Sequence, residues 1–264
     1  MSLTNKTLAN TYKDILQMDN SNSGVDTSAK AVKDGEGTQS ALYLSDDLVG
    51  VRPANDDTTA TFVVSSLSGT ALLSVDTTNS KVSALGNNIN TQYATFGVAS
   101  GQATNFVDDT HHPIPFQQGV YAASLSGYIP AFGTGTDPAT TFTTAEGNAT
   151  RAAELVPVIW YVPDAISIDA VTSLEGADTA TGDTTRMHLF SYTFTSGATN
   201  CLTDGTLLAH NSDVTNAGSE QPYLSTWTVD SAAVAAGKVI LAFFKSDSIN
   251  SDYSINIKVK YHLT

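Results

Sequence analysis

Residues 253–264 alternate between apolar and polar side chains without a break. Such period-two alternation predicts a β-strand in a sheet with one buried face and one face in water. A strand of this kind needs partner strands and a second layer, so it commits a large part of the chain to a layered β fold. The apolar positions are Tyr253, Ile255, Ile257, Val259, Tyr261 and Leu263.

Four other segments are rich in β-branched and aromatic residues, which favour strands. Gly, Asp and Asn, the residues of tight turns, lie between them. We therefore expect a mainly β chain in which residues 101–264 form a C-terminal antiparallel β-sandwich. A jelly-roll-like topology fits better than an immunoglobulin-like one, because the connections are long and a single cysteine excludes a Cys-Trp-Cys signature. The four segments are residues 156–162, 187–194, 223–229 and 239–244.

The acidic residues are 21 Asp and only 5 Glu. This skew supports turn-rich β structure, because Asp bonds its own backbone in turns whereas Glu favours helices. The net charge of −14, with 12 basic residues, argues against nucleic acid as a partner. Cys201 is the single cysteine, so no intrachain disulfide can form. No run approaches the roughly 18 apolar residues of a membrane span, and the first residues are polar, so we expect a soluble chain made in the cytoplasm.

The first 35 residues predict a short helix and a polar linker, which we interpret as an N-terminal anchor segment, residues 1–35. The helix should end by about Met18. Residues 19–24 follow it, and their Asp, Asn, Ser and Gly favour a turn over a helix. One face of the predicted helix consists of Leu8, Tyr12, Ile15 and Leu16.

Residues 36–100 contain two copies of a crude unit that begins with Gly-Thr, at Gly37 and again at Gly69. Each unit continues as strand, polar turn and strand, which predicts a small β-hairpin. Repeat units of this kind cannot bury their apolar faces alone, so we expect a slender stem completed by other chains around a threefold axis. The alternative is that the hairpins pack on the C-terminal sandwich within one larger fold. The residues expected at the trimer interface are Leu42, Leu44, Val49, Val51, Phe62, Val64, Leu73, Val75, Val82 and Leu85.

Local catalytic motifs are absent from the sequence: it has no Gly-x-Ser-x-Gly, no His-Glu-x-x-His and no Cys-x-x-Cys. Glycoside hydrolysis uses a pair of carboxylates. In a chain with this many Asp residues some pair will have a suitable separation by chance, so such a pair does not indicate a glycosidase. We therefore predict a non-enzymatic protein with no catalytic residues and no cofactor. Four aromatic residues would stack on sugars if they were exposed, but their strand patterns favour the core. They are Trp160, Tyr161, Tyr223 and Trp227.

The sharpest cluster of potential ligands lies at residues 108–112, where carboxylates and imidazoles are close enough in sequence to share a cation such as Zn²⁺. The same residues fit a solvated polar loop that connects stem and sandwich, and we favour that interpretation. The cluster consists of Asp108, Asp109, His111 and His112.

Several segments carry a family resemblance. Residues 11–24 (TYKDILQMDNSNSG), with residues 32–37 and 41–45, resemble the opening of hypothetical structural proteins in phages of marine bacteria. Residues 72–82 (LLSVDTTNSKV) are similar to stem repeats of phage fibre proteins. Residues 230–241 and 252–263 look like the β-sandwich head of the same proteins.

The resemblance implies a virion structural protein, either a capsid decoration or head fibre or a tail fibre component, commonly a homotrimer. Residues 1–35 would bind other virion proteins, such as the major capsid or tail proteins. The sandwich head would then be presented on the virion surface after synthesis in the host cytoplasm. The alternative function is a receptor-binding adhesin tip that recognises host surface polysaccharide. That alternative requires a concave patch with exposed aromatic side chains and convergent carboxylates or amides.

Overall fold

The structure, a computed structural model, divides into two compact units, Met1–Ile89 and Asn90–Thr264. Antiparallel strands dominate both units, which confirms the mainly β fold class. None of the described segments is a helix long and apolar enough to cross a membrane. The described residues are 15–18, 20–21, 23–101, 109–117, 155–178, 181–198, 201–218, 220–247 and 252–264.

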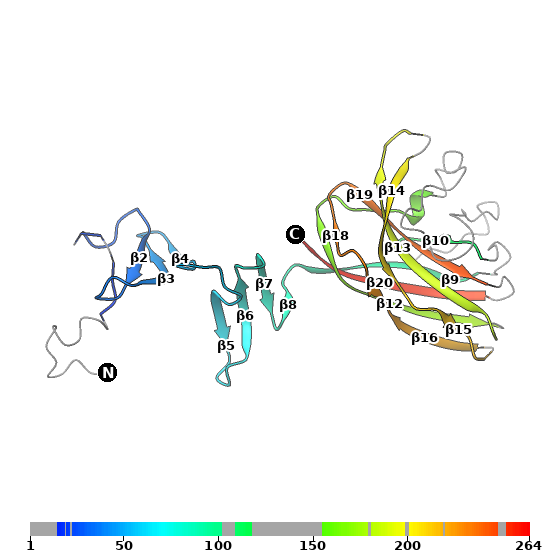
Figure 1. Ribbon diagram of the computed structural model, residues 1–264, viewed down its shortest axis with the longest axis horizontal. Helices are drawn as coiled ribbons and strands as arrows, with labels where there is room; N and C mark the ends of the chain where they lie inside the picture. Colours follow the sequence, from blue (N-terminus) through cyan, green and yellow to red (C-terminus); the bar gives the residue numbers. More distant parts are fainter. Residues whose placement is uncertain are drawn as a thin grey trace. The chain divides into compact units, whose positions relative to one another are not determined.

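The first unit contains two four-stranded antiparallel sheets, each ordered as in the sequence (Figure 1). The predicted helix does not extend to Met18, because Gln17 and Met18 pair with β2 as a short strand. Residues 1–14, where the rest of that helix was expected, lie outside the described residues. One sheet consists of β1 (Gln17–Met18), β2 (Lys30–Lys33), β3 (Gln39–Leu44) and β4 (Val49–Val51). The other consists of β5 (Phe62–Ser65), β6 (Ala71–Asp76), β7 (Lys81–Ala84) and β8 (Asn87–Asn88).

The two sheets repeat the same turn, 32 residues apart in the sequence. Gly37 and Gly69 adopt φ values of +89° and +85°, a region that glycine enters without steric cost. The backbone N–H of each glycine donates to the carbonyl three residues earlier, at 3.1 Å and 2.9 Å. In each turn the N–H of the following threonine donates to a side-chain oxygen, of Asp34 or of Ser66. The repeat unit therefore has one more strand than the predicted hairpin, because β2 and β5 precede the turns.

The second unit is built from a five-stranded and a seven-stranded antiparallel sheet. The strand predicted at residues 156–162 is shorter than expected, because the 3-10 helix η4 (Val156–Val158) occupies its first half. The five-stranded sheet has the order β16-β12-β20-β9, with β18 paired to β12. Its strands are β9 (Thr91–Gly101), β12 (Ile166–Asp178), β16 (Glu220–Thr226), β18 (Ala233–Val234) and β20 (Asp252–Leu263).

The seven-stranded sheet has the order β10-β19-β13-β14-β17, with β11 paired to β19 and β15 to β13. The stem was predicted to end at residue 100. Its last ten residues instead form most of β9, which is a strand of the second unit. The strands of the seven-stranded sheet are β10 (His112–Ile114), β11 (Trp160–Tyr161), β13 (Thr184–Phe194), β14 (Leu202–His210), β15 (Val214–Thr215), β17 (Thr228–Val229) and β19 (Lys238–Ser246).

The hydrophobic core of the second unit lies between its two sheets. Ile255, Ile257 and Val259 point into it from β20, as the alternation predicts, whereas Lys258 is exposed. The apolar run at residues 239–244 does not alternate, because it forms most of β19 and both faces of that strand are buried. Alternate side chains of β19 contribute to the inter-sheet core and to a second cluster against η4. Burial on both faces explains a continuous apolar run in place of an alternating one.

Single alanine substitutions at Ile257 and at Lys258 compare the buried face of β20 with its exposed face. Ile257 is fully buried, so Ile257→Ala should leave a cavity and lower the free energy of unfolding by about 3 kcal/mol. Lys258→Ala should change it by less than about 0.5 kcal/mol, because the side chain is in water. Chemical denaturation followed by tryptophan fluorescence measures both values. Equal losses in the two variants would contradict the facing of this strand.

Candidate functional site

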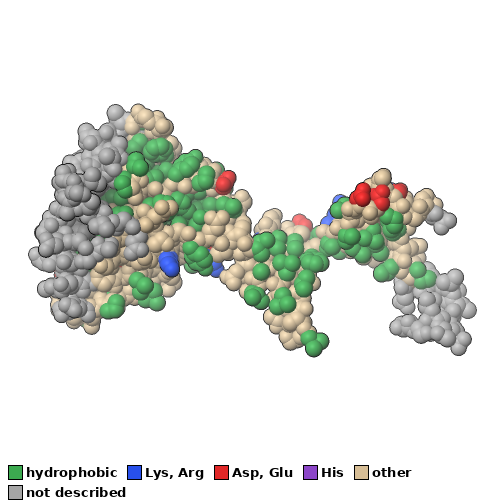
Figure 2. All heavy atoms as spheres, turned by 180° about the vertical axis from the view of Figure 1, so that it is seen from behind, with side chains coloured by type: hydrophobic (Ala, Val, Ile, Leu, Met, Phe, Trp, Pro, Cys, Tyr) green, Lys and Arg blue, Asp and Glu red, His purple; other side chains and the backbone are tan. Residues whose placement is uncertain are grey.

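Five of the residues predicted at a trimer interface share one face of the β5–β8 sheet. Each β6 residue on this face has apolar partners on both β5 and β7. Phe62 and Val64 are 40% and 44% exposed, and Figure 2 shows hydrophobic side chains gathered over this sheet. Leu85 does not join them, because it lies in the turn after β7 with a φ of 48° and its side chain is exposed. The five residues are Phe62, Val64, Leu73, Val75 and Val82.

Four further predicted interface residues share one face of β3 and β4, where Leu42 faces Val51 and Leu44 faces Val49. Val49 and Val51 are 71% and 41% exposed. The opposite face is covered by the chain itself: Tyr43 is buried there, and the guanidinium of Arg52 lies 4.2 Å from the centre of its ring. One face of this sheet is therefore closed and the other is open.

These nine residues form two surfaces, here named the assembly faces. Among the described residues of the first unit, Val32 and Tyr43 are the only buried hydrophobic side chains. An apolar sheet face needs a second layer to leave water, and a few strands alone are marginally stable. Each assembly face is therefore an apolar surface that a single chain leaves partly in water.

In the part of the chain that the structure describes, members of the predicted cation cluster at residues 108–112 contact residues outside the cluster. The carboxylate of Asp109 forms an ion pair with Lys245 at 3.1 Å, and Asp108 lies outside the described residues. His111 and His112 are buried, so the solvated loop favoured from the sequence is wrong for these two residues. The ring of His111 lies 5.1 Å from the ring of His188. Burial and the neighbouring His111 lower the pKa of His188 to about 2, so its imidazole is neutral. The described residues include no group of three or more His, Cys, Asp or Glu side chains that could hold a metal ion.

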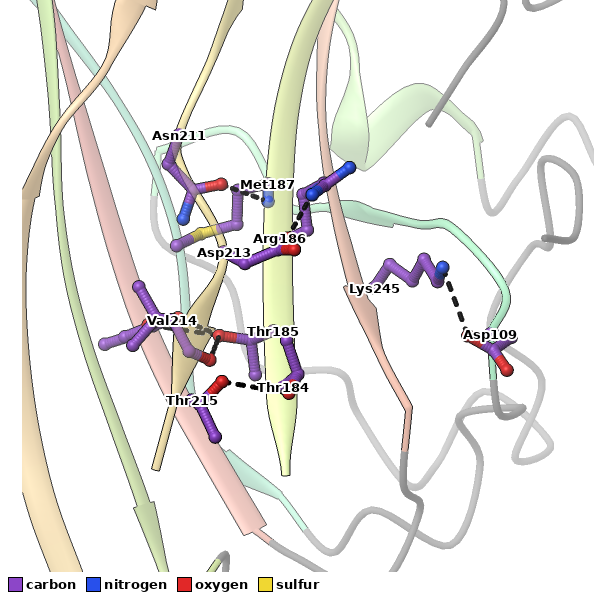
Figure 3. A network of polar contacts seen from close by, with 11 residues as sticks. Asp109, Thr184, Thr185, Arg186, Met187, Asn211, Asp213, Val214, Thr215 and Lys245 are labelled. Carbon is purple, nitrogen blue, oxygen red and sulfur yellow. Dashed lines mark hydrogen bonds and ion pairs between the residues drawn. The ribbon is translucent and has the colours of Figure 1, made fainter. Parts of the chain in front are cut away.

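A buried carboxyl group lies where β12 and β13 of the two sheets approach each other. Glu175 of β12 accepts a hydrogen bond of 3.0 Å from the hydroxyl of Thr185 on β13. Burial raises the pKa of Glu175 to about 7, and the Thr185 hydroxyl offsets part of that effect. Beside it, Arg186 forms an ion pair with Asp213, which follows β14 (Figure 3). The network ties neighbouring strands together, and the buried carboxyl of Glu175 ionises less readily than an exposed one.

An aromatic hollow of about 640 Å³ lies at one edge of the sandwich. Residues 112–114 pair with β19 of one sheet, and the chain then crosses to the other sheet, where Gln117 N–H donates to Thr95 O of β9 at 2.7 Å. This crossing brings together β9, β11 and the end of β20. The residues that define the hollow are Tyr93, Phe116, Gln117, Trp160, Tyr161 and Tyr261.

The floor of the aromatic hollow is a set of rings in mutual contact. Phe116 stacks on Trp160, with ring centres 5.8 Å apart and planes 4° from parallel. Tyr261 packs against Trp160 at 4.9 Å, and its hydroxyl donates to the side-chain oxygen of Gln92 at 2.8 Å. Burial raises the pKa of Tyr261 above its ordinary value. The floor is therefore rigid and partly polar.

Two exposed tyrosines border the aromatic hollow, one on each sheet. The strand registers place Tyr93 beside Lys260 on the outer face of the five-stranded sheet and Tyr161 beside Val239 on the outer face of the seven-stranded sheet. Tyr93 of β9 is 65% exposed and Tyr161 of β11 is 56% exposed. The core interpretation is therefore wrong for Tyr161, whereas Trp160 is only 7% exposed. Trp227 is also buried, and its indole N–H donates to the hydroxyl of Ser173 at 2.9 Å.

Tyr223 does not belong to the hollow, because β16 lies at the opposite edge of the five-stranded sheet from β9. Its hydroxyl accepts from the backbone N–H of Ala217 at 3.1 Å and donates to Gln221. Sequence reasoning did not select Tyr93, Phe116 or Tyr261 for this site. The signal for Tyr261 was present in the alternation of β20 but indicated only burial. Nothing in the sequence linked residues 93, 116, 160 and 261.

No protein-family model matches this chain, and no curated protein matches it.

The raised pKa of Glu175 predicts a pH-dependent stability. The folded state holds the proton more tightly than the unfolded chain, so this contribution is complete below the ordinary pKa of 4.5 and is lost as the pH rises through about 7. The loss should amount to about 3 kcal/mol. Glu175→Gln should abolish it, so that the variant is more stable than wild type above pH 7, as measured by denaturant titrations from pH 4.5 to 8. Asp164→Asn, at an exposed carboxylate, is the control and should keep the wild-type decline. A parallel decline in wild type and Glu175→Gln would contradict this assignment.

Proposed function

We propose that this chain is a non-enzymatic structural protein of a tailed phage particle that self-associates, as a homotrimer, through its first unit. The single observation that carries self-association is the pair of exposed assembly faces. The assignment to a phage particle rests on the sequence resemblance. In this proposal the protein is a capsid decoration, a head fibre or a tail fibre component, displayed on the virion surface after synthesis in the host cytoplasm.

The physical argument for self-association is the cost of exposed apolar side chains. Burial of a large apolar side chain such as Leu73 or Val75 contributes roughly 1.5–3 kcal/mol before entropy is subtracted. The shared turn geometry at Gly37 and Gly69 makes the two sheets copies of one unit. Such repeats become stable when further copies are stacked on them, and other chains can supply these copies.

The remaining parts of the proposal follow from the resemblance. The anchor segment, residues 1–35, including the predicted short helix, binds other virion proteins such as the major capsid or tail proteins. The second unit is a jelly-roll-like head. This head is the part of the protein that is displayed on the outside of the particle.

One observation favours a second candidate function, that of a receptor-binding adhesin tip that recognises host surface polysaccharide. The aromatic hollow is a concave patch with exposed tyrosines and the amide of Gln117 beside them. Exposed aromatic side chains and an amide beside a hollow are part of what the adhesin alternative requires. The two functions are compatible, because they use different units of the chain.

Self-association is tested by a matched pair of substitutions on β6. Leu73 lies on an assembly face, whereas Leu72 points to the opposite side of the same strand. We expect Leu73→Asp to place a charge in the interface and to reduce the trimer to monomer, since an uncompensated buried charge costs several kcal/mol. Leu72→Asp should leave the trimer intact. Light scattering on the purified full-length proteins measures the masses. A wild-type monomer, or a Leu73→Asp trimer, would refute the proposed interface.

A further inference from the structure

We infer that the outer face of the five-stranded sheet binds an acidic saccharide, whose carboxylates pair with Lys258 and Lys260 while a sugar ring stacks on Tyr93. This inference deepens the second candidate function and rests on it, but not on self-association. A uronic acid has an apolar C–H face, polar hydroxyls and one carboxylate. A site for a chain of such sugars needs an exposed aromatic ring, neutral hydrogen-bonding groups and cations side by side.

The strand registers place these three kinds of group next to one another. Lys258 and Lys260 alternate with core residues along β20, so both point to the outer face. On β9, Thr95 lies opposite the first lysine and Tyr93 opposite the second. Residues directly opposite each other in antiparallel strands have Cβ atoms about 5 Å apart. One ligand can therefore contact the ring, the hydroxyl and both ammonium groups.

The charge of this face is the first argument. Lys258 and Lys260 lie on the same side of one strand, with Cα atoms about 7 Å apart, and like charges at this spacing repel each other. Their neighbours across the strands are uncharged, since on β12 these are Thr172 and Ala170. An anionic ligand that bridges the two lysines would replace this repulsion with attraction.

Other cations of the second unit are arranged differently. Arg186 and Lys245 each form an ion pair with an aspartate. His262, the next side chain on the same face of β20, donates to the carboxylate of Asp169 at 2.9 Å. The chain has a net charge of −14, but salt screens charges that lie farther than about 8 Å away. A ligand in contact with this face is therefore governed by the two lysines.

The aromatic and neutral polar groups are the second argument. The side chain of Tyr93 is 65% exposed, so one face of its ring is open to a sugar. The backbone N–H of Gln117 donates to Thr95 O at 2.7 Å, which places this residue at the free edge of β9. The amide of Gln117 and the hydroxyl of Thr95 can each donate to and accept from sugar hydroxyls.

The number and spacing of the charges favour an acidic saccharide over a nucleic acid. Double-stranded DNA carries one negative charge per about 1.7 Å of its axis, and its binding depends on many phosphate contacts. This face offers two lysines, and the excess of carboxylates in the chain repels so dense a polyanion. A polyuronate has one carboxylate per sugar, and the C–H faces between its charges suit a tyrosine ring.

The test uses the full-length chain and acidic tetrasaccharides of galacturonate, mannuronate and guluronate, each compared with its methyl ester, which differs only in charge. Isothermal titration calorimetry measures the affinities. We expect at least one acid to bind with a Kd of about 1 mM or lower, and its ester to bind about tenfold more weakly. Raising the NaCl concentration from about 0.05 M to about 0.5 M should weaken binding of the acid severalfold, because salt screens exposed ion pairs.

Substitutions locate the site. Lys258→Gln and Lys260→Gln should each weaken binding about threefold, and the double variant about tenfold, because each removes one exposed ion pair. Tyr93→Ala should weaken binding about fivefold, whereas Tyr93→Phe retains the ring and should retain most of the affinity. Lys81→Gln, which removes an exposed lysine of the first unit, is the charge-matched control and should bind as wild type does.

Four results would overturn the inference: no acidic tetrasaccharide binds up to about 10 mM, the esters bind as well as the acids, the lysine variants bind normally, or an oligothymidylate binds as tightly as the acids. Saccharide binding that persists in the lysine variants would overturn this site but leave the adhesin function standing. Absence of binding by every acid and every ester would overturn both. The solution mass of Leu73→Asp tests self-association separately, because the assembly faces lie in the first unit.

Discussion

The burial of β19 on both of its faces is the constraint on which the second unit depends. Ala242 and Phe244 pack into the core between the sheets, whereas Phe243 packs against the second cluster on the other side. A slip of one residue would exchange these two sets, so the register of β19 is strongly specified. Because β10 and β11 both pair with β19, the same register also positions Trp160 and, through the crossing that follows β10, Phe116.

The first unit differs from the second in how little it buries. Its strands are paired by backbone hydrogen bonds and joined by well-defined turns, but they enclose little apolar volume. Gly37 and Gly69 define the turns, and Tyr43 with Arg52 covers one side of the first sheet. The assembly faces then remain in water within a single chain. In the proposed trimer, other chains supply the second layer, which couples the stability of the first unit to the concentration of chains.

The proposed self-association and saccharide binding reinforce each other physically. A shallow site made of one exposed ring and two surface lysines binds a short saccharide weakly, because few polar contacts are buried. Three such sites on one trimer, and many trimers on one particle, convert weak binding into strong attachment to a polymer with repeated sugars. The division of the chain at residues 89 and 90 separates the unit that would associate from the unit that would bind.

Three features could be predicted from short stretches of sequence: the strand β20 from its alternation, the repeated units from their Gly-Thr turns, and the strand β19 from its apolar run. The period-two pattern also placed nine of the ten predicted interface residues on shared faces of their sheets. The strand at Gln17–Met18 was not predicted, since pairing with β2 overrides a helical pattern there. The aromatic hollow was decided only by the tertiary structure. Phe116, Trp160 and Tyr261 are far apart in the sequence, and only the packing of two sheets and the crossing between them bring their rings together.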